Sequence, residues 1–452
     1  MDSLRAATRA FGCRPFSMVS PPLAVDFPSG TAYTPSPMFK AHHRHYAAGF
    51  LLDCGVMVSF TAMPFFIFNQ MNGQEDTSGT IAGIQAVAYG AVCLMLAGPR
   101  SPLPRLGLRA SAIGTALFGI FFCGAVFAKT AFWYSVWTTV GMCGMAMVWP
   151  ALHAWIGADT NLRRRNRRMS RFNLSWSLGF SVGPFLGGVL YVIDYRLPFL
   201  VTFLFTLATF IILVVAPEER RYFGAAPAER SEEHLQHDRD SEVHLYAAWG
   251  ANLVANALVV VARSVFPKRL EELVNTGQLR FFFESTAHPF LTADAATKFM
   301  WLAAAMAAAN ALTFFAMGRS RWWHYRFSML AGMQVVAGLA FWALAYTHSL
   351  AVMLVCCAAV GIAWGGSFFA AVFYSVANPA LKHRRASVNE AGVGLGGFLG
   401  GILFSYFARH YGLVTPFIYT PAAIGAALLL QYALLRYSSR RQRILDAARL
   451  SS

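Results

Sequence analysis

Charged residues are scarce in this chain of 452 residues. They make up 13% of it, while hydrophobic residues make up 56%; soluble domains carry roughly 25% charged residues. A chain of this length has too little interior to hide so much apolar surface. The composition therefore excludes an ordinary soluble fold and favours lipid as the solvent.

Cysteine is also sparse, and its placement argues against redox or zinc chemistry. The chain has seven cysteines; Cys13 stands alone near the N-terminus, and the others lie in apolar segments without disulfide or zinc-site spacing. No Walker A pattern is present, which argues against a self-contained ATP-driven pump. We therefore expect no metal and no cofactor.

Acidic residues are outnumbered by basic ones, which gives a net charge of +16. In a soluble protein this charge would suggest a nucleic-acid partner. Here the basic residues lie in short loops between apolar segments, and no basic stripe interleaved with aromatic residues is visible. This placement indicates membrane topology and a bilayer with anionic lipid, and no nucleic acid is expected.

Twelve apolar stretches have the roughly 20 residues that a membrane-spanning helix needs. They fall into two sets of six on either side of a charged stretch from Pro217 to Glu242. The predicted spans are 46–68, 79–98, 111–128, 132–156, 172–193 and 198–215, then 244–266, 295–317, 327–346, 350–375, 387–407 and 415–436.

Lys and Arg concentrate in alternate loops, which by the positive-inside rule places both termini in the cytoplasm. We expect an all-α integral membrane protein, a monomer in a plasma membrane, most simply a bacterial inner membrane. The expected parts are a disordered tail (1–44), a six-helix bundle (45–216), a cytoplasmic linker (217–243), a second bundle (244–437) and a C-terminal tail (438–452). The N-terminal arginines also faintly resemble a transit peptide, and a start at Met38 is a further alternative.

A repeated pattern links the fifth and eleventh spans. Residues 168–190 and 385–403 both contain Arg-x-Ser, then an Asn, then a glycine run that ends in Leu-Gly-Gly. Residues four apart share a helix face, and small residues on that face let two helices pack closely in lipid. We predict a sliding contact within a transport pathway, with static helix association as the alternative, at Gly179, Gly183 and Gly187 and at Gly392, Gly396 and Gly400.

With these residues the chain resembles the Major Facilitator Superfamily from about Tyr46 to Tyr437. The run Gly179-x-x-x-Gly183-Pro184-x-x-Gly187-Gly188 is similar to the antiporter signature of that superfamily, gxxxGPxxGG. The resemblance implies twelve helices in two pseudo-symmetric six-helix bundles and transport by alternating access. It also implies that Pro184 bends a glycine-lined helix beside the pathway.

The chain departs from the superfamily at two places. Arg105 and Arg109 match the end of its G-x-x-x-D-R-x-G-R motif and are implied to hold helix ends on the inner side, but Pro104 replaces the motif's Asp. The fourth span lacks the buried arginine usual in the superfamily's proton-driven drug exporters; His153 is its basic residue. The second departure argues against drug export.

Ionisable side chains inside a bilayer are costly and are therefore candidates for proton coupling. Asp53 lies about 10 Å into the first span, where surroundings of low polarity favour the protonated form of an acid; pairing with an inner-loop arginine is the alternative. His153 has the side chain that titrates near neutral pH, although an interfacial position is the alternative. Glu390 is a third candidate, but Ser387-x-x-Glu390 fits a helix capping box, which is the favoured interpretation.

Polar and aromatic side chains on apolar spans are candidates to line a substrate cavity. Arg263 is expected either to extend to the headgroups or to bind an anionic substrate. For the others, hydrogen bonding between helices is the alternative role. These candidates are Gln85, Tyr89, Trp149, Asn173, Trp176, Asn252, Asn256, Asn310, Gln334, Trp364 and Tyr374.

Together these features predict a secondary transporter rather than an enzyme. We expect it to move a small organic solute by proton-coupled antiport, that is, efflux. The alternative from the same fold is an uptake symporter or facilitator for a sugar, organic acid or nucleoside. The alternative of another class, a membrane sensor or enzyme that does not transport, would need a soluble domain, and the stretches outside the spans are too short for one.

Overall fold

The computed structural model describes residues 38–71, 75–157, 162–215, 232–280 and 295–451. All twelve predicted spans lie within these ranges. Residues from Lys40 onward form one compact unit. Most of the predicted N-terminal tail lies outside the described residues, and so does most of the predicted linker.

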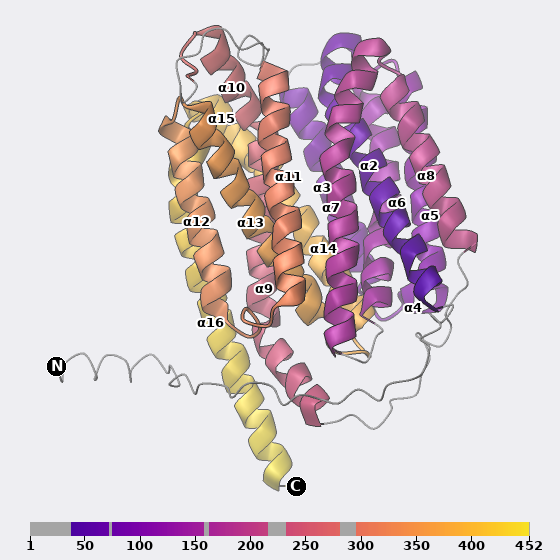
Figure 1. Ribbon diagram of the computed structural model, residues 1–452, viewed down its shortest axis with the longest axis vertical. Coiled ribbons are helices and arrows are strands. Elements are labelled where there is room, and N and C mark those ends of the chain that lie inside the picture. Colours follow the sequence, from indigo (N-terminus) through magenta and orange to yellow (C-terminus); the bar gives the residue numbers. More distant parts are fainter. Residues whose placement is uncertain (1–37, 72–74, 158–161, 216–231, 281–294, 452) are drawn as a thin grey trace, which may run out of the picture. The chain divides into compact units, whose positions relative to one another are not determined.

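The first half of the described chain is a set of six long helices with two short ones between them (Figure 1). Continuous apolar sequence gives these helices their length, because a backbone in lipid must satisfy its hydrogen bonds within the segment. The elements are α2 (Met38–Met71), α3 (Glu75–Leu96), α4 (Leu103–Leu106), α5 (Leu108–Gly124), η1 (Ala125–Phe127), α6 (Ala131–Ile156), α7 (Leu162–Ile193) and α8 (Leu197–Val215).

The second half repeats this plan. Its eleventh span contains a stretch of π-helix, η3, at the glycine-rich end of α14. The elements are α9 (Glu232–Ser264), α10 (Phe266–Asn275), α11 (Ala295–Arg319), α12 (Phe327–Tyr346), α13 (Leu350–Ser375), α14 (Lys382–Phe398), η3 (Leu399–Leu403), α15 (Phe404–Tyr411) and α16 (Thr415–Ser451).

In the described part of the chain, 12 helices are long and apolar enough to cross a membrane. Large apolar side chains stay exposed on them, among them Met95 at 77%, Val192 at 87% and Val355 at 69%. Exposing such an apolar surface to water is unfavourable, whereas contact with lipid hydrocarbon is favourable. The predicted fold class, an all-α membrane protein with twelve spanning helices in two halves, is confirmed.

Two helix pairs make most of the contact between the halves. Helix α3 packs against α14, and α7 packs against α11; Figure 1 shows α7 and α11 side by side in the middle of the molecule. Phe185 and Trp301 are in ring contact across the second pair, 6.3 Å between centroids. The two pairs define the seam along which the halves meet.

The glycine face of α7 packs on α2, within the first half. A Cβ added to Gly183 would lie 2.7 Å from the carbonyl oxygen of Cys54, and one added to Gly187 would lie 2.6 Å from that of Val58. Gly179 is equally crowded by the backbone at Phe50. Any larger residue would push the two backbones apart.

In the second half α14 packs on α9 in the corresponding way. A Cβ on Gly396 would lie 2.5 Å from the carbonyl oxygen of Leu253, and Gly400 is crowded by the backbone at Ala257. Gly392 departs from the predicted face, because a Cβ there would meet nothing within 4 Å. Gly394 instead contacts the other half: its Cβ would lie 2.8 Å from the carbonyl oxygen of Ala86 on α3.

Several helices are longer than their predicted spans. Helix α9 begins at Glu232, inside the predicted linker, and α14 begins at Lys382, before the predicted eleventh span. Helix α16 runs for 37 residues to Ser451, through the predicted C-terminal tail. The predicted spans end where charge begins, but a helix continues through charged residues once it has left the apolar layer.

Candidate functional site

Glu390 bridges the two halves at their seam. It lies on α14 and is 2% exposed. The hydroxyl of Tyr89, on α3, donates a hydrogen bond of 2.7 Å to its Oε2. Nδ1 of His153, on α6, lies 3.3 Å from its Oε1. A buried carboxylate of one half is therefore held by two side chains of the other half.

The capping box predicted for Glu390 is wrong. Helix α14 begins at Lys382, so Ser387 and Glu390 lie within the helix rather than at its start. The carboxylate of Glu390 therefore does not cap a helix end; it contacts Tyr89 and His153 of the other half. Neither ring nitrogen of His153 has a hydrogen bond with the described residues, so its contact with Glu390 is a close approach of 3.3 Å rather than a hydrogen bond.

A row of amides continues from Glu390 into the second half. The amide of Asn389 donates to Oε1 of Glu390 over 3.2 Å, and that of Asn252 donates to Oδ1 of Asn389 over 3.0 Å. Asn256 donates to Oδ1 of Asn252 over 2.9 Å, as expected of residues four apart on one face. The row ties the position of the carboxylate to α9.

Asp53, on α2, is a second buried carboxylate. It is 7% exposed and has no hydrogen bond or ion pair with the residues that the structure describes. Its charge interacts with that of Arg263, on α9, and with that of Glu390. Arg263 lies over the ring of Phe180, 4.2 Å from its centroid, rather than reaching toward the headgroups. The two acids and the arginine form one electrostatic group across the halves.

Aromatic rings pack across the seam beside this group. Trp176 of α7 lies 6.0 Å from Trp364 and 5.4 Å from Phe368, both on α13. His153 lies 5.7 Å from Phe368 and stacks on Trp149 at 6.1 Å, between ring centroids. The side chains that meet here come from α6, α7 and α13, so this cluster contains residues of both halves.

Several buried polar atoms in this region have no hydrogen-bond partner among the described residues. They are the indole nitrogen of Trp364, the amide nitrogen of Asn173 and the amide oxygen of Asn310. Asn310 does donate to Oγ of Ser177 over 3.1 Å, across the seam. Unsatisfied buried donors and acceptors are costly, which makes them candidates to bind a polar ligand.

Three predicted cavity residues lie elsewhere. Gln85 donates to Oγ1 of Thr138 over 2.7 Å, within the first half. Gln334 and Gln431 exchange hydrogen bonds of 2.9 Å between α12 and α16. The hydroxyl of Tyr374 accepts from the backbone N–H of Tyr325 near the helix ends. Each of these side chains links neighbouring elements, which is the alternative role.

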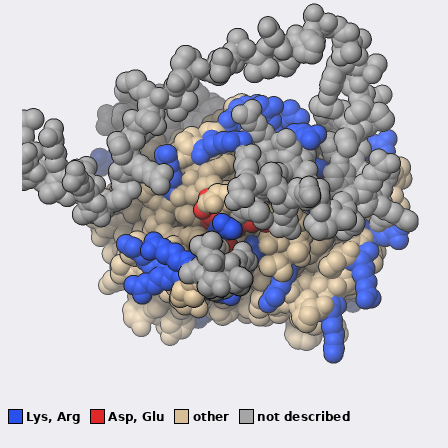
Figure 2. Space-filling model, turned by 90° about the horizontal axis from the view of Figure 1, so that it is seen from below, with Lys and Arg blue, Asp and Glu red and all other residues tan. Residues whose placement is uncertain are grey.

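The inner-loop arginines lie where the chain turns from α4 into α5. Arg105 and Arg109 are both exposed, and Gly107 between them has φ of 55°, a conformation that favours glycine. We call the end of the bundle that carries this turn the basic end. Figure 2 shows it with many Lys and Arg side chains and few acidic ones among the visible atoms.

Sequence reasoning missed Asn389, Ser177 and Phe368. Asn389 lies inside the predicted capping box, which hides its role, although an Asn beside a buried Glu signals a polar contact. Nothing in the periodicity identifies Ser177 or Phe368, because small polar and aromatic residues are common on membrane helices.

The model of the family described as Major Facilitator Superfamily matches residues 46–267. The crystal structure of the human organic anion transporter MFSD10 (TETRAN) is similar over 88% of this chain and 99% of that one, with a TM-score of 0.60 and 13% identity.

A Major Facilitator Superfamily transporter, FucP, in the outward conformation has a TM-score of 0.55 and 14% identity, over 88% of this chain and 98% of that one. The fucose:proton symporter FucP of E. coli, in a second crystal structure, gives 0.56 and 12% over the same shares. No curated protein matches the chain in sequence. At these identities the likeness to solved structures concerns the fold.

Proposed function

Because the chain belongs to the Major Facilitator Superfamily and is a multi-pass secondary transporter, we propose that it exports a small organic solute in exchange for protons. Glu390 and Asp53 bind the proton in this proposal. Both are buried carboxylates, and both interact electrostatically with the opposite half.

The observation that carries the proposal is the bridge at Glu390. Hydrogen bonds and ion pairs to a charged carboxylate are stronger than those to a neutral acid. A proton on Glu390 therefore weakens its contacts with Tyr89 and His153 and lets the halves separate. Loss of the proton restores the contacts, so that protonation and the closing of the seam are coupled.

Asp53 supplies a second proton site on the first half. Its carboxylate has no hydrogen-bond partner among the described residues, and Arg263 is the cation that interacts with it. When Asp53 takes a proton, the negative charge that attracts Arg263 is lost, and Arg263 is available to an anionic solute. Proton and anion bind together at this group, which by itself favours symport, so the proposal of antiport rests on the bridge at Glu390.

The aromatic cluster and the unsatisfied amides indicate the chemical class of the solute. Trp176 and Trp364 favour a flat or apolar surface, while Asn173 and Asn310 favour polar groups on it. Arg263 favours a negative charge, which agrees with the organic anion named for one structural neighbour. We propose an aromatic or otherwise apolar organic acid.

We further propose that the basic end faces the cytoplasm and that both termini lie there. The excess of Lys and Arg at that end supports this orientation through the positive-inside rule. A bacterial inner membrane is the proposed location, and a monomer the proposed state.

Everted membrane vesicles test the proposal directly. Respiration acidifies their interior, and acridine orange reports the gradient. Salicylate, ethidium and fucose are added in turn; we expect an aromatic acid such as salicylate to discharge the gradient. The discharge should disappear in Glu390→Gln and persist in Gln334→Ala, whose side chain lies away from the seam. A discharge unchanged in both Glu390→Gln and Asp53→Asn contradicts the proposal.

Uptake by proton symport is the second candidate. It is favoured by the row of neutral amides at Asn252, Asn256 and Asn389, since amides are well suited to hydroxyl groups. Symport predicts that intact cells accumulate labelled fucose and that an uncoupler abolishes the accumulation. Antiport predicts that the uncoupler instead raises the amount of labelled salicylate retained in the cells.

A further inference from the structure

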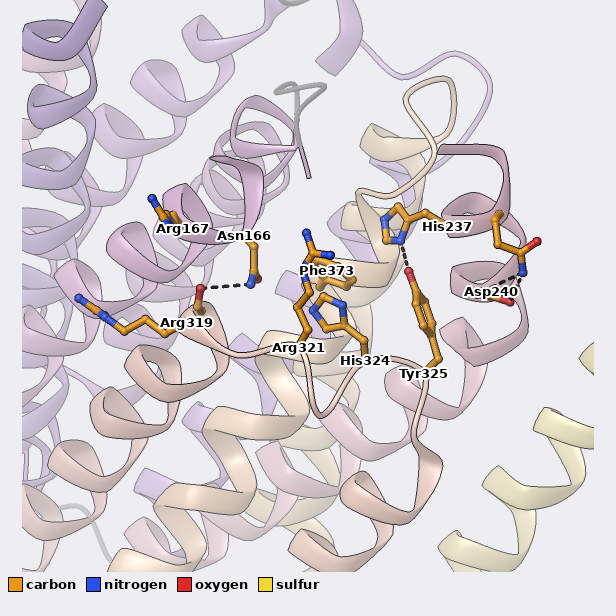
Figure 3. A pocket seen from close by; sticks show the side chains of 11 residues that line it. Asn166, Arg167, His237, Asp240, Arg319, Arg321, His324, Tyr325 and Phe373 are labelled. Atoms are coloured by element: carbon orange, nitrogen blue, oxygen red, sulfur yellow. Dashed lines mark hydrogen bonds between the residues drawn. The ribbon is translucent and has the colours of Figure 1, made fainter. Parts of the chain in front are cut away.

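Two adjoining hollows open at the basic end, where the halves meet. The larger has a volume of about 470 Å³ and is lined by α7, α9, α13 and the connection from α11 to α12 (Figure 3). The other, of about 450 Å³, lies between α7 and α11. Arg167, Gly318 and Arg319 line both, so the two hollows form one continuous site.

Arginines from both halves face this site. Arg167 and Arg171 lie on α7, in the first half, while Arg319 and Arg321 lie on α11 and the loop after it, in the second. All four are exposed, and none makes an ion pair with a residue that the structure describes. Figure 3 shows Arg167 and Arg319 reaching out on the same side of the site.

Negative charge in the site is small. Asp240 is its one carboxylate among the described lining residues, and its oxygens accept hydrogen bonds of 3.0 Å from Gln236. His324 adds no positive charge at neutral pH, because burial, with Arg321 and Arg165 nearby, lowers its pKa to about 4. Among its described lining residues the site therefore presents four arginine cations and one carboxylate.

Hydrogen bonds from neutral side chains help to hold the seam closed at this place. The amide of Asn166 donates to the carbonyl oxygen of Gly318 over 3.1 Å, and Oγ of Ser170 donates to that of Phe314 over 2.9 Å. His237 contacts both Arg165 of the other half and Tyr325. Closing the seam thus brings arginines of the two halves together, while Asp240, the one carboxylate among the described lining residues, is bonded to Gln236; like charges oppose that approach.

We propose that this site binds a phosphate group, which bridges Arg167 and Arg171 of the first half to Arg319 and Arg321 of the second. Arginine is suited to this task because its planar guanidinium donates two parallel hydrogen bonds to phosphate oxygens. The bound phosphate replaces repulsion by attraction across the seam. It therefore stabilises the state in which the basic ends of the two halves are in contact.

The phosphate comes either from the headgroup of an anionic lipid or from a soluble phosphate. The site lies where α7 and α11 end their apolar sequence, so a headgroup reaches it from the bilayer surface. Neither Glu390 nor Asp53 lines it. The proposal concerns regulation of the closed state and stands whether or not the transport proposal is correct.

Thermal unfolding of the purified full chain in nanodiscs tests the proposal and separates the two sources. One arm uses discs of phosphatidylcholine alone, with inorganic phosphate titrated against chloride at constant ionic strength. The other arm compares these discs with discs that also contain phosphatidylglycerol. We expect either inorganic phosphate or phosphatidylglycerol to raise the unfolding temperature of the wild type. The ligand that does so identifies the source of the phosphate group.

Variants then locate the effect. Arg167→Ala combined with Arg319→Ala should weaken the response at least about tenfold in phosphate or lipid concentration, which corresponds to about 1.4 kcal/mol. The control removes two exposed arginines outside the site, Arg100→Ala with Arg326→Ala, and should respond as the wild type does. If the variant with Arg167→Ala and Arg319→Ala does not fold, Arg321→Gln replaces it as the site variant and should weaken the response. An equal response in wild type, control and site variants, or no response in either arm, overturns the proposal.

Discussion

Glu390 is buried at the seam, so a change in its partners acts on both halves at once. The carboxylate is held by the hydroxyl of Tyr89 and by the ring of His153. Hydrogen bonds to charged groups contribute about 1.5–3 kcal/mol each. The bridge should therefore be measurable as stability as well as transport.

Tyr89→Phe removes the hydroxyl that donates to Glu390 and should lower the free energy of unfolding by about 1.5–3 kcal/mol. Proton-driven transport should fall at least about tenfold, the factor that corresponds to 1.4 kcal/mol. Thermal unfolding in detergent and the acridine orange assay measure the two effects.

The matched control is Tyr134→Phe. Tyr134 is fully buried, and its hydroxyl has no hydrogen-bond partner among the described residues. Its removal should leave both quantities unchanged or raise the stability slightly. Equal losses in the two variants would show that the hydroxyl of Tyr89 has no special role.

At the residue scale, the sequence identifies which groups are unusual but not what they contact. Asp53, His153 and Glu390 stand out because charge is costly in lipid. The capping-box interpretation of Glu390 fails because it places Lys382 and Arg385 in a loop, whereas they form the first turn of α14. Basic residues at the membrane surface occur both in loops and in the first turn of a helix, so their presence does not show where the helix begins.

The glycine faces determine behaviour at the scale of the helix pair. Gly187→Ala should destabilise the protein by about 1–3 kcal/mol, because the new Cβ would lie 2.6 Å from the carbonyl oxygen of Val58 and α7 must move off α2. Transport should slow, because the altered packing of α7 on α2 changes the position of α7, which also contacts the second half. Thermal unfolding and initial rates check this expectation.

Gly392→Ala is the control on the corresponding helix of the second half. It has the same change of side chain in α14, but the added Cβ meets nothing within 4 Å. Because alanine is the better helix former by about 1 kcal/mol, the variant should be as stable as the wild type or more so. A loss as large as that of Gly187→Ala would mean that packing is not the cause.

Sequence periodicity predicts which residues share a helix face, but it does not identify the partner of that face. Gly183 and Gly396 both lie in close contacts, yet the contacts are with α2 and α9, which the pattern alone does not name. Gly392 has the right spacing and no partner. A repeat every four residues is a property of one helix, whereas a contact requires two.

The two halves must separate along the seam if the transporter works by alternating access. Cysteines at Ser177 and Asn310, whose Oγ and Nδ2 atoms are now 3.1 Å apart, should be joined by a short, reducible bifunctional thiol reagent in a background without the native cysteines. The crosslink should arrest transport, and reduction should restore it. Solute flux before and after reduction is the measurement.

Cysteines at Gln85 and Thr138 provide the matched control. Their side chains are 2.7 Å apart, but both lie in the first half. A crosslink there should leave transport running, because it does not span the seam. Arrest by both crosslinks, or by neither, would contradict motion of the halves as separate bodies.

At the scale of the whole molecule, the number of spans and the division into halves follow from hydropathy and from the alternation of basic loops. The pairing of α3 with α14 and of α7 with α11 does not. Those contacts join residues far apart in the sequence, such as Tyr89 and Glu390. Nothing in one segment of sequence records which distant segment lies against it.

Helix α16 reaches well past any bilayer. Its 37 residues span about 55 Å, against a hydrocarbon layer of about 30 Å. The part of α16 that extends beyond the hydrocarbon layer is a continuous helix rich in arginine, rather than an irregular tail. A fluorescent protein fused to the last residue would stand away from the membrane surface and turn with the second half, so its orientation would report the tilt of that half.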